Sequence, residues 1–200
     1  MTESKIDPTG VRGEPLRHRV LDAAEHLLRD GKADFSMRQL AAQAQVSFAT
    51  PFNQFGSKAA IMHALSKRRI DTMTGRFSAA AQPDGAAERV LLAIDIAVAV
   101  MVEEPAINRA VMSWVGTAGG GDVLQHSAAL WALALSDGEA LSAQRREKAL
   151  SCLPRQLAFA FRGVLSFWTA GELADDALAS HAREAALTLL LGFTEPGGAR

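Results

Sequence analysis

The residues of this sequence that could do chemistry gather between Phe35 and Ile70. This stretch contains no acidic residue and five basic ones, which are Arg38, Lys58, Lys67, Arg68 and Arg69. Between them stand hydroxyl and amide side chains that can donate hydrogen bonds to phosphate or read base edges. A positive surface of this kind suits a polyanion such as nucleic acid. Taken alone, the basic stretch is equally typical of a solvated helical face.

Basic and acidic residues are distributed unevenly along the chain. The 200 residues are 48% apolar and 22% charged with a net charge of −1, which is typical of a soluble globular protein and excludes disordered, collagen-like and rod-like classes. Residues 1–80 carry twelve Lys and Arg against eight Asp and Glu, a charge of +4. The remaining residues carry nine against fourteen, a charge of −5. The nearly neutral net charge therefore combines two electrostatically different parts of the chain.

Other chemistries find no motif in the sequence. The single Cys152 cannot form an internal disulfide, and the five histidines follow neither zinc nor di-iron spacing. Glu103 and Glu104 directly precede Pro105, the predicted first residue of a helix. Acidic side chains are stabilised at a helix N-terminus, so we favour this structural role over acid–base catalysis. We expect no catalytic residue, no metal site and no cofactor. Without a signal-like segment or a membrane-length apolar run, a cytoplasmic protein without membrane contact is predicted.

Helical periodicity predicts four helices over residues 14–80. The first is amphipathic and ends at Gly31. Ser36 is predicted to cap the second, with Gln39 completing a capping box. The third is predicted over 48–55 with Ser47 as its cap, and the fourth runs from Ser57 toward Ala80. The two short helices, joined by a turn at residues 44–46, match a helix-turn-helix.

The rest of the chain is predicted to be helical as well, which makes the fold all-α. Pro83–Gly85 breaks the pattern, and we place the domain boundary there. Helices are expected over 86–103, from Pro105 to a glycine break at 119–121, over 123–135, over 139–170 with a possible break at Pro154, and over 175–193. The expected organisation is a flexible arm at 1–14, a helix-turn-helix domain with its linking helix at 15–82, a helical domain at 83–195 and a flexible tail at 196–200.

The N-terminal region resembles the TetR family of transcriptional regulators. The resemblance rests on ArgValLeuAspAlaAla at 19–24, Ser36, Arg38, Leu40, Ala41, Ala44, Val46, Ser47, ThrProPheAsnGlnPhe at 50–55 and GlySerLys at 56–58. It implies a three-helix DNA-binding domain joined by a long fourth helix to a C-terminal ligand-binding and dimerisation domain. The implied function is a homodimeric regulator, more typically a repressor, that binds a palindromic double-stranded DNA operator.

The resemblance also implies which residues contact DNA. They are Ser36, Arg38, Ser47, Phe48, Ala49, Thr50, Phe52, Asn53 and Lys58. The sequence departs from the family pattern at three positions. Gln45 replaces a usual glycine, where a positive φ would cost about 1–2 kcal/mol. Phe52 lacks the usual hydroxyl. Pro51 has no N–H for the first hydrogen bond of the recognition helix, so it is expected to distort the start of that helix.

Two further sites are expected in the C-terminal domain. Its large aromatic and thioether side chains either fill a core or line a cavity for an apolar or amphipathic effector. The candidates for the cavity are Met101, Met112, Trp114, Trp131, Phe161 and Trp168. The apolar faces of the last two helices predict a four-helix dimer interface, with packing inside one chain as the alternative. The candidates for the interface are Leu157, Val164, Leu178, Ala185 and Leu189.

Two other functions remain open at this level. An all-α small-molecule binder or enzyme would use the same C-terminal domain, although it would be expected to carry acids in the 35–70 stretch and a reactive cluster elsewhere. A non-specific nucleic-acid binder would contact phosphates without ranking sequences.

Overall fold

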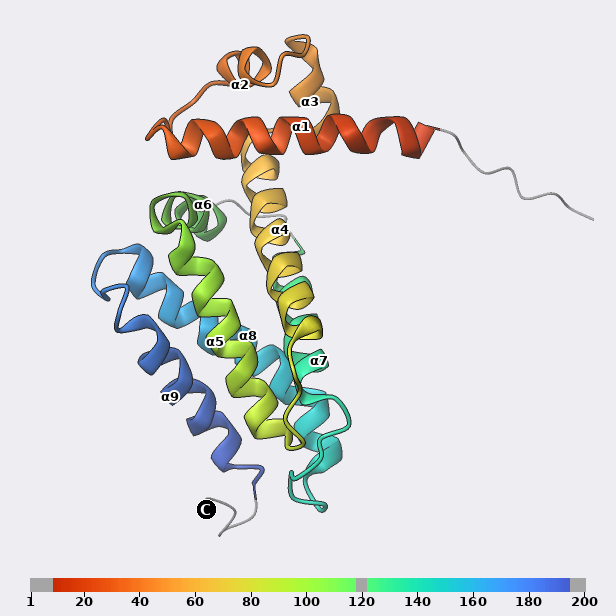
Figure 1. The fold of residues 1–200 in the computed structure, drawn as a ribbon, viewed down its shortest axis with the longest axis vertical. Helices are drawn as coiled ribbons and strands as arrows, with labels where there is room; N and C mark the ends of the chain where they lie inside the picture. Colours follow the sequence, from red (N-terminus) through yellow and green to blue (C-terminus); the bar gives the residue numbers. More distant parts are fainter. Residues whose placement is uncertain (1–8, 118–121, 195–200) are drawn as a thin grey trace, which may run out of the picture. The chain divides into compact units, whose positions relative to one another are not determined.

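A computed structural model describes residues 9–117 and 122–194. Within these ranges the chain forms helices and no strand, apart from an isolated bridge between Leu141 and Thr194 (Figure 1). The helices are α1 (Thr9–Arg29), α2 (Met37–Gln43), α3 (Ala49–Phe55), α4 (Lys58–Ala79), α5 (Ala86–Glu103), α6 (Pro105–Thr117), α7 (Val123–Leu135), α8 (Arg146–Thr169) and α9 (Leu178–Leu191). The all-α prediction is confirmed. The predicted glycine break at 119–121 and tail at 196–200 lie outside the described residues.

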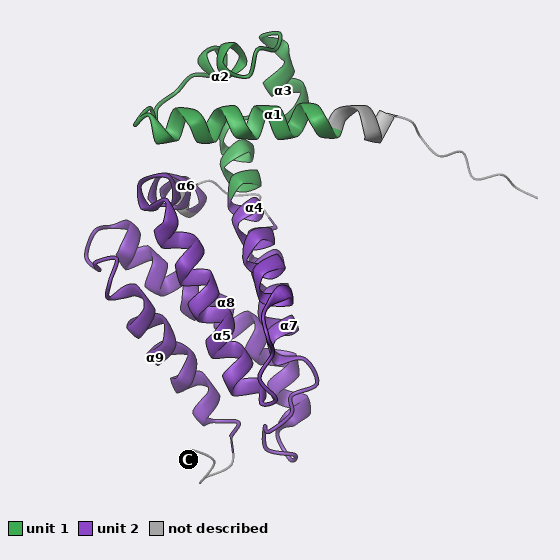
Figure 2. Cartoon of the chain, viewed as in Figure 1, with its two compact units in different colours: residues 1–65 green, residues 66–200 purple. Residues whose placement is uncertain are grey.

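The chain divides into two compact units, residues 1–65 and 66–200 (Figure 2). The division falls inside α4, whereas the sequence pattern places a boundary at Pro83–Gly85. The reason is packing: Ile70, Met73 and Phe77 of α4 are buried in the core of unit 2. A turn-forming triplet marks the end of a helix, but the burial of side chains decides which unit a helix belongs to.

Unit 1 is built on the apolar stripe of α1. Val20, Ala24, Leu27 and Leu28 recur at helical spacing and are buried, and α1 packs against α2 and α3. This helix begins at Thr9, so residues 9–14 of the expected flexible arm are helical and residues 1–8 lie outside the description. Pro15 therefore lies inside α1 rather than at its start, although it has no N–H to donate there.

Local capping signals set the start of two helices in this unit. The Ser36 hydroxyl accepts from the backbone N–H of Gln39 at 3.2 Å, and the Gln39 side chain accepts from the Ser36 N–H at 2.7 Å. This is the predicted capping box. The Ser57 hydroxyl likewise accepts from the Ala60 N–H at 3.1 Å ahead of α4. Both predictions are confirmed.

Unit 2 is a helical bundle in which α5, α7, α8 and α9 pack on one another, and α6 packs on α5 and α8. Its core surrounds Trp131 and Trp168, which have no exposed surface. The α8 helix begins at Arg146, later than predicted, because Ser136, Gly138 and Ala140 all adopt a positive φ that no right-handed helix contains. Pro154 does not break α8, whose neighbouring residues Leu153 and Leu157 are fully buried.

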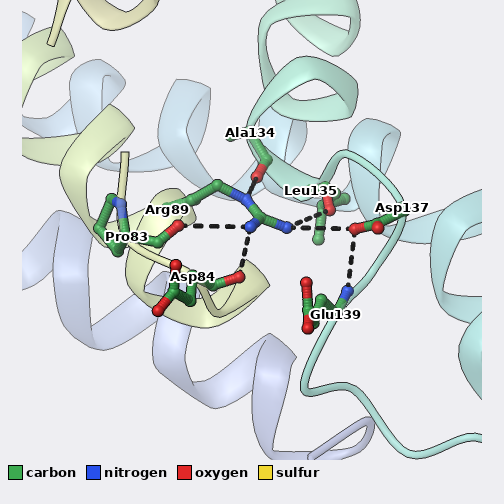
Figure 3. A network of polar contacts seen from close by, with 7 residues as sticks. All are labelled: Pro83, Asp84, Arg89, Ala134, Leu135, Asp137 and Glu139. Carbon is green, nitrogen blue, oxygen red and sulfur yellow. Dashed lines mark hydrogen bonds and ion pairs between the residues drawn. The ribbon is translucent and has the colours of Figure 1, made fainter. Parts of the chain in front are cut away.

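A buried arginine closes the end of this bundle (Figure 3). Arg89 of α5 donates to the carbonyls of Ala134 at 3.1 Å and Leu135 at 3.2 Å, which are among the last of α7. Its other donors reach the carbonyls of Pro83 and Asp84 and the Asp137 carboxylate. The final carbonyls of a helix have no partner within it and carry its negative partial charge. Arg89 therefore joins the α4–α5 loop to the end of α7.

Candidate nucleic-acid interface

The turn between α2 and α3 depends on an unusual backbone conformation. Gln45, which replaces the glycine that is usual at this turn position, has a positive φ of +53°. The Val46 N–H donates to the Ala41 carbonyl at 3.0 Å and so closes the end of α2. Leu40, Ala41 and Ala44 are buried beneath the turn. The helix-turn-helix geometry is thus retained, and the left-handed conformation of Gln45 costs about 1 kcal/mol or more relative to glycine.

The start of α3 differs from the prediction. Ser47 is not its side-chain cap, because its hydroxyl bonds to the Thr50 hydroxyl at 2.8 Å, while its carbonyl accepts from the Thr50 N–H at 2.9 Å. The helix begins one residue later than expected, at Ala49. Pro51 then stands at the third helical position, where an N–H has no partner within the helix. The expected loss of a hydrogen bond at Pro51 therefore does not occur.

An arginine of α1 holds the other end of α3. Arg17 donates from Nη1 to the Gln54 carbonyl at 2.6 Å, and its guanidinium lies 4.3 Å from the centroid of the Phe55 ring. The helix ends at Gly56, which has a φ of +76°. A cation at a helix C-terminus is favoured by the helix dipole. Arg17 positions α3, although nothing in the sequence distinguishes it from the other polar residues of α1.

These contacts leave one side of α3 open to solvent. Phe48 and Phe52 are 54% and 42% exposed, and their rings meet edge to face at 5.6 Å. Ala49 and Asn53, one helical turn apart, are exposed as well, and Thr50 is half-buried. We call Phe48, Ala49, Phe52 and Asn53 the α3 face. It offers an amide that can form two hydrogen bonds and apolar groups that fit a thymine methyl.

Two of the predicted DNA contacts, Arg38 and Ser36, belong to the first turn of α2 and its cap. Arg38 of α2 is exposed and its guanidinium lies 5.6 Å from the Phe48 ring centroid, so the structure brings its charge to the α3 face. Ser36 is exposed, but its hydroxyl is already used in the capping box. The structure therefore places Arg38 better than Ser36 for a phosphate.

The Lys58 side chain, which is predicted to contact DNA, forms a hydrogen bond within its own chain. Its Nζ donates to the Ala33 carbonyl at 2.7 Å and sits 4.4 Å from the Phe35 ring centroid. Burial lowers the pKa of this amine, an effect that the nearby Asp34 charge opposes. The lysine joins the start of α4 to the loop before α2, which is a structural role that the sequence does not reveal.

The predicted effector residues are only partly brought together. Unit 2 contains a cavity of about 370 Å³ whose lining includes Met101, Met112, Trp131 and Phe161. Trp168 is excluded from it, being buried in the core with its Nε1 donating to the Asp175 carboxylate at 2.7 Å. Trp114 is half-buried and does not line the cavity either. Composition identifies the large side chains of this domain, but it does not distinguish those that are buried in the core from those that line the cavity.

The predicted dimer residues are mostly turned inward. Leu157 and Leu178 are fully buried within the chain, which contradicts their assignment to a surface between subunits. Val164, Ala185 and Leu189 are half-buried. The exposed apolar side chains of these helices are Phe159 and Phe167 of α8 and Leu187 and Leu191 of α9. The prediction named mostly side chains on the core-facing sides of α8 and α9.

Ion pairs connect the part of α4 that belongs to unit 2 with other helices of that unit. Arg76 forms a two-bond pair with Glu103 of α5, and Lys67 pairs with Asp122 before α7 at 3.0 Å. Arg76 lowers the pKa of Glu103, and Lys67 lowers that of Asp122. Glu103 is thus an ion-pair partner and not the helix-start charge predicted from sequence.

Other kinds of site are absent from the described ranges. Residues 9–117 and 122–194 contain no group of three or more His, Cys, Asp or Glu that could hold a metal ion. None of the helices described there is long and apolar enough to cross a membrane.

Solved structures share this arrangement of helices. A TetR transcriptional regulator from Rhodococcus sp. RHA1 aligns with a TM-score of 0.70 at 23% identity, covering 89% of this chain and 97% of its own. A TetR-like transcriptional regulator from the same organism aligns at 0.52 and 20% identity, over 88% and 96% of the two chains. A putative TetR-family regulator from Shewanella sp. PV-4 aligns at 0.51 and 15% identity, over 90% and 99%.

Comparisons at the level of sequence add nothing to this. No protein-family model matches the sequence, and no curated protein matches it. The structural similarity shows that the chain has a TetR-like fold, which confirms the fold implied by the sequence resemblance.

Proposed function

We propose that this protein is a sequence-specific DNA-binding transcriptional regulator. The observation that carries the proposal is the α3 face, on the second helix of a helix-turn-helix. This face presents Asn53 and two exposed aromatic rings, and Arg38 of α2 lies beside it. In this motif the second helix lies in the major groove, where an amide can bind adenine at two positions. The solved structures with the same fold are titled transcriptional regulators, which supports the same function.

The proposed active form is a homodimer that binds an inverted repeat. The outward-facing Phe159, Phe167, Leu187 and Leu191 of α8 and α9 supply apolar surface for a two-fold interface. Two recognition helices related in this way would read half-sites roughly 34–36 Å apart. The interface residues of this proposal replace Leu157 and Leu178, which are buried inside the chain.

The proposed control is a small molecule bound in the unit 2 cavity. Ile70 and Met73 of α4 line this cavity, and the same helix begins in unit 1 at Lys58. A ligand that moves α4 against its ion pairs with α5 and α7 would change the population of the DNA-binding conformation. A coupling free energy of about 1–3 kcal/mol would change operator affinity roughly 5- to 150-fold. We propose a repressor whose effector releases it from DNA.

Selection from a random pool of double-stranded DNA at about 0.15 M salt tests this function. The full chain is expected to enrich one inverted repeat. Asn53→Ala is expected to weaken binding by about 1–3 kcal/mol and relax the preference at one base pair of each half-site. Arg38→Gln is expected to weaken all sequences alike and to reduce the salt dependence of binding by about one charge for each subunit.

The matched control is Lys32→Gln, which removes an exposed charge of unit 1 outside α2 and α3. Its effect on the selected sequence should be small. Enrichment of no sequence would replace the proposal with non-specific nucleic-acid binding. Equal losses for Asn53→Ala and Lys32→Gln would contradict the assignment of the α3 face as the reading surface.

A further inference from the structure

The cavity of unit 2 has a largely apolar wall that includes two arginines. Its volume of about 370 Å³ lies in the range of small-molecule sites, and at about 30 Å³ for each water-sized group it holds roughly a dozen non-hydrogen atoms or more. Most of the wall is aliphatic, aromatic or thioether, from α4 to α8. Its polar side chains are Ser66, Arg69, Asn108, Ser127 and Arg162, so the described lining has two cations and no acid.

The first of these cations is held by its own chain. Arg69 donates from Nε to the Asn108 amide oxygen at 2.9 Å, and its Nη2 lies 3.6 Å from the Glu104 carboxylate. Asn108 is buried and donates in turn to the carbonyls of Val100 and Met101 at the end of α5. Arg69 is therefore a structural member of the wall.

The second cation is bound far more weakly. Arg162 has five N–H donors, and the contacts it makes in the described chain go to one residue: Nη1 to the Met112 sulfur at 3.2 Å and Nη2 to the Met112 carbonyl at 3.3 Å. Thioether sulfur is a weak acceptor. The described residues supply no carboxylate to this guanidinium. Burial lowers the pKa of this guanidinium.

This environment discriminates among ligand head groups. A charge removed from water is costly unless it is paired, and guanidinium matches a carboxylate with two parallel hydrogen bonds. A cationic ligand would meet two arginines and no acid. A neutral ligand would fill the apolar space but leave Arg162 without an anion. An anion with an apolar body satisfies both parts of the wall.

We propose that the cavity binds an amphipathic monocarboxylic acid, with its carboxylate on Arg162 and its apolar body against Trp131, Phe161 and Leu130. The proposal names the chemical class of the effector and rests on the proposed function only for the link to DNA. The assignment of the ligand stands on the cavity itself. Trp131, which is fully buried and lines the cavity, supplies a fluorescence signal for binding.

Decanoate, decanol and decylamine test the head group because they share one apolar chain. Binding to the full chain is measured by calorimetry and tryptophan fluorescence, below the concentrations at which these compounds form micelles. Decanoate is expected to bind roughly 10- to 100-fold more tightly than decanol, with decylamine weakest. The aromatic acid 2-naphthoate, measured in parallel, separates chain-shaped from ring-shaped bodies. Equal affinities for the three head groups, or a preference for the amine, would overturn the proposal.

Variants at Arg162 locate the carboxylate. Arg162→Met is expected to lower decanoate affinity to that of decanol while leaving decanol binding nearly unchanged. Arg162→Lys, which keeps the charge but loses the planar fork, is expected to retain part of the preference. Arg146→Gln, at the exposed start of the same helix, is the control and should bind decanoate like the parent. A decanoate preference that survives Arg162→Met in a folded protein would overturn the assignment.

The link to DNA is measured separately, as the affinity for the selected repeat with and without decanoate. A decrease that is lost in Arg162→Met supports both the ligand class and the proposed control. Decanoate binding at Arg162 with unchanged DNA affinity would support the ligand class and overturn the effector role proposed above.

Discussion

Arg89 is buried and Arg162 half-buried in unit 2, and their surroundings differ. Arg89 donates to four backbone carbonyls and the Asp137 carboxylate (Figure 3), whereas among the described residues Arg162 donates to the sulfur and carbonyl of Met112 beside a cavity. The first arginine is part of the fold because the chain supplies its acceptors. The second is the proposed ligand contact because the described residues supply it with few acceptors. The number of acceptors around a guanidinium therefore distinguishes the structural arginine from the proposed binding arginine.

The largest effect expected from this comparison is on Arg89. Arg89→Met should lower the free energy of unfolding by about 3–5 kcal/mol, because it leaves several buried carbonyls without donors. Urea denaturation of the full chain measures the change. Arg146→Gln should stay within about 0.5 kcal/mol of the parent. A loss below about 1 kcal/mol for Arg89→Met would mean that water replaces the guanidinium without penalty.

Lys58 of unit 1 provides an intermediate case. Lys58→Met should lower the free energy of unfolding by about 1–2 kcal/mol, since it removes one charged hydrogen bond to the Ala33 carbonyl and the contact with the Phe35 ring. The same urea experiment applies, with Lys32→Gln as the exposed control. If Lys58→Met had the same free energy of unfolding as the parent, the hydrogen bond to the Ala33 carbonyl would not stabilise the fold.

Arg162 should respond in the opposite direction. Without ligand, Arg162→Met is expected to leave the free energy of unfolding unchanged or raise it by up to about 1 kcal/mol, because an unpaired, partly desolvated charge is replaced by a thioether of similar length. Urea denaturation in ligand-free buffer measures this. A loss as large as that of Arg89→Met would break the comparison and identify Arg162 as a structural residue.

Arg76 adds an exposed but well-paired guanidinium, for which the smallest effect is expected. Its partner Glu103 has a pKa below the usual range, so the pair contributes stability above the unfolded pKa, and this contribution is lost as pH falls through the lowered folded value. Because both side chains are exposed, the contribution is small. Unfolding of the parent and Glu103→Gln should therefore differ at pH 7, and the difference should shrink as the pH falls through the lowered pKa of Glu103. A difference that does not shrink on acidification would show that the side chain acts through packing.

Local signals in the sequence predicted the fold of unit 1 well. The capping box of Ser36 and Gln39 and the cap at Ser57 involve residues three positions apart, so the sequence contains the whole interaction. The positive φ of Gln45 follows from the turn geometry of the motif. Ser47 was assigned the wrong partner because its hydroxyl can reach either a backbone N–H or the Thr50 hydroxyl, and spacing does not decide between them.

Contacts distant in sequence were not predictable in the same way. The acceptors of Arg89 lie about 5 and 45 residues away, and Arg17 reaches Gln54 across 37 residues. The late start of α8 depends on positive φ values at Ser136 and Ala140, which are not glycines. The exclusion of Trp168 from the cavity, and the burial of Leu157 and Leu178, depend on how helices rotate about their axes when they pack. Hydrophobic spacing predicts which side of a helix is apolar, but it does not predict which residues pack against that side.

The location of the division inside α4 has a consequence for protein engineering. Because Leu65 and Ser66 belong to one helix, no loop separates the two units at their boundary. A chimera that exchanges one unit must therefore be spliced in helical phase: one residue inserted there turns the following part of α4 by about 100° and shifts it by about 1.5 Å. An insertion of about seven residues, two full turns, nearly restores the original phase. In such chimeras the number of residues in the splice, more than their identity, should decide which ones retain the proposed response to a ligand.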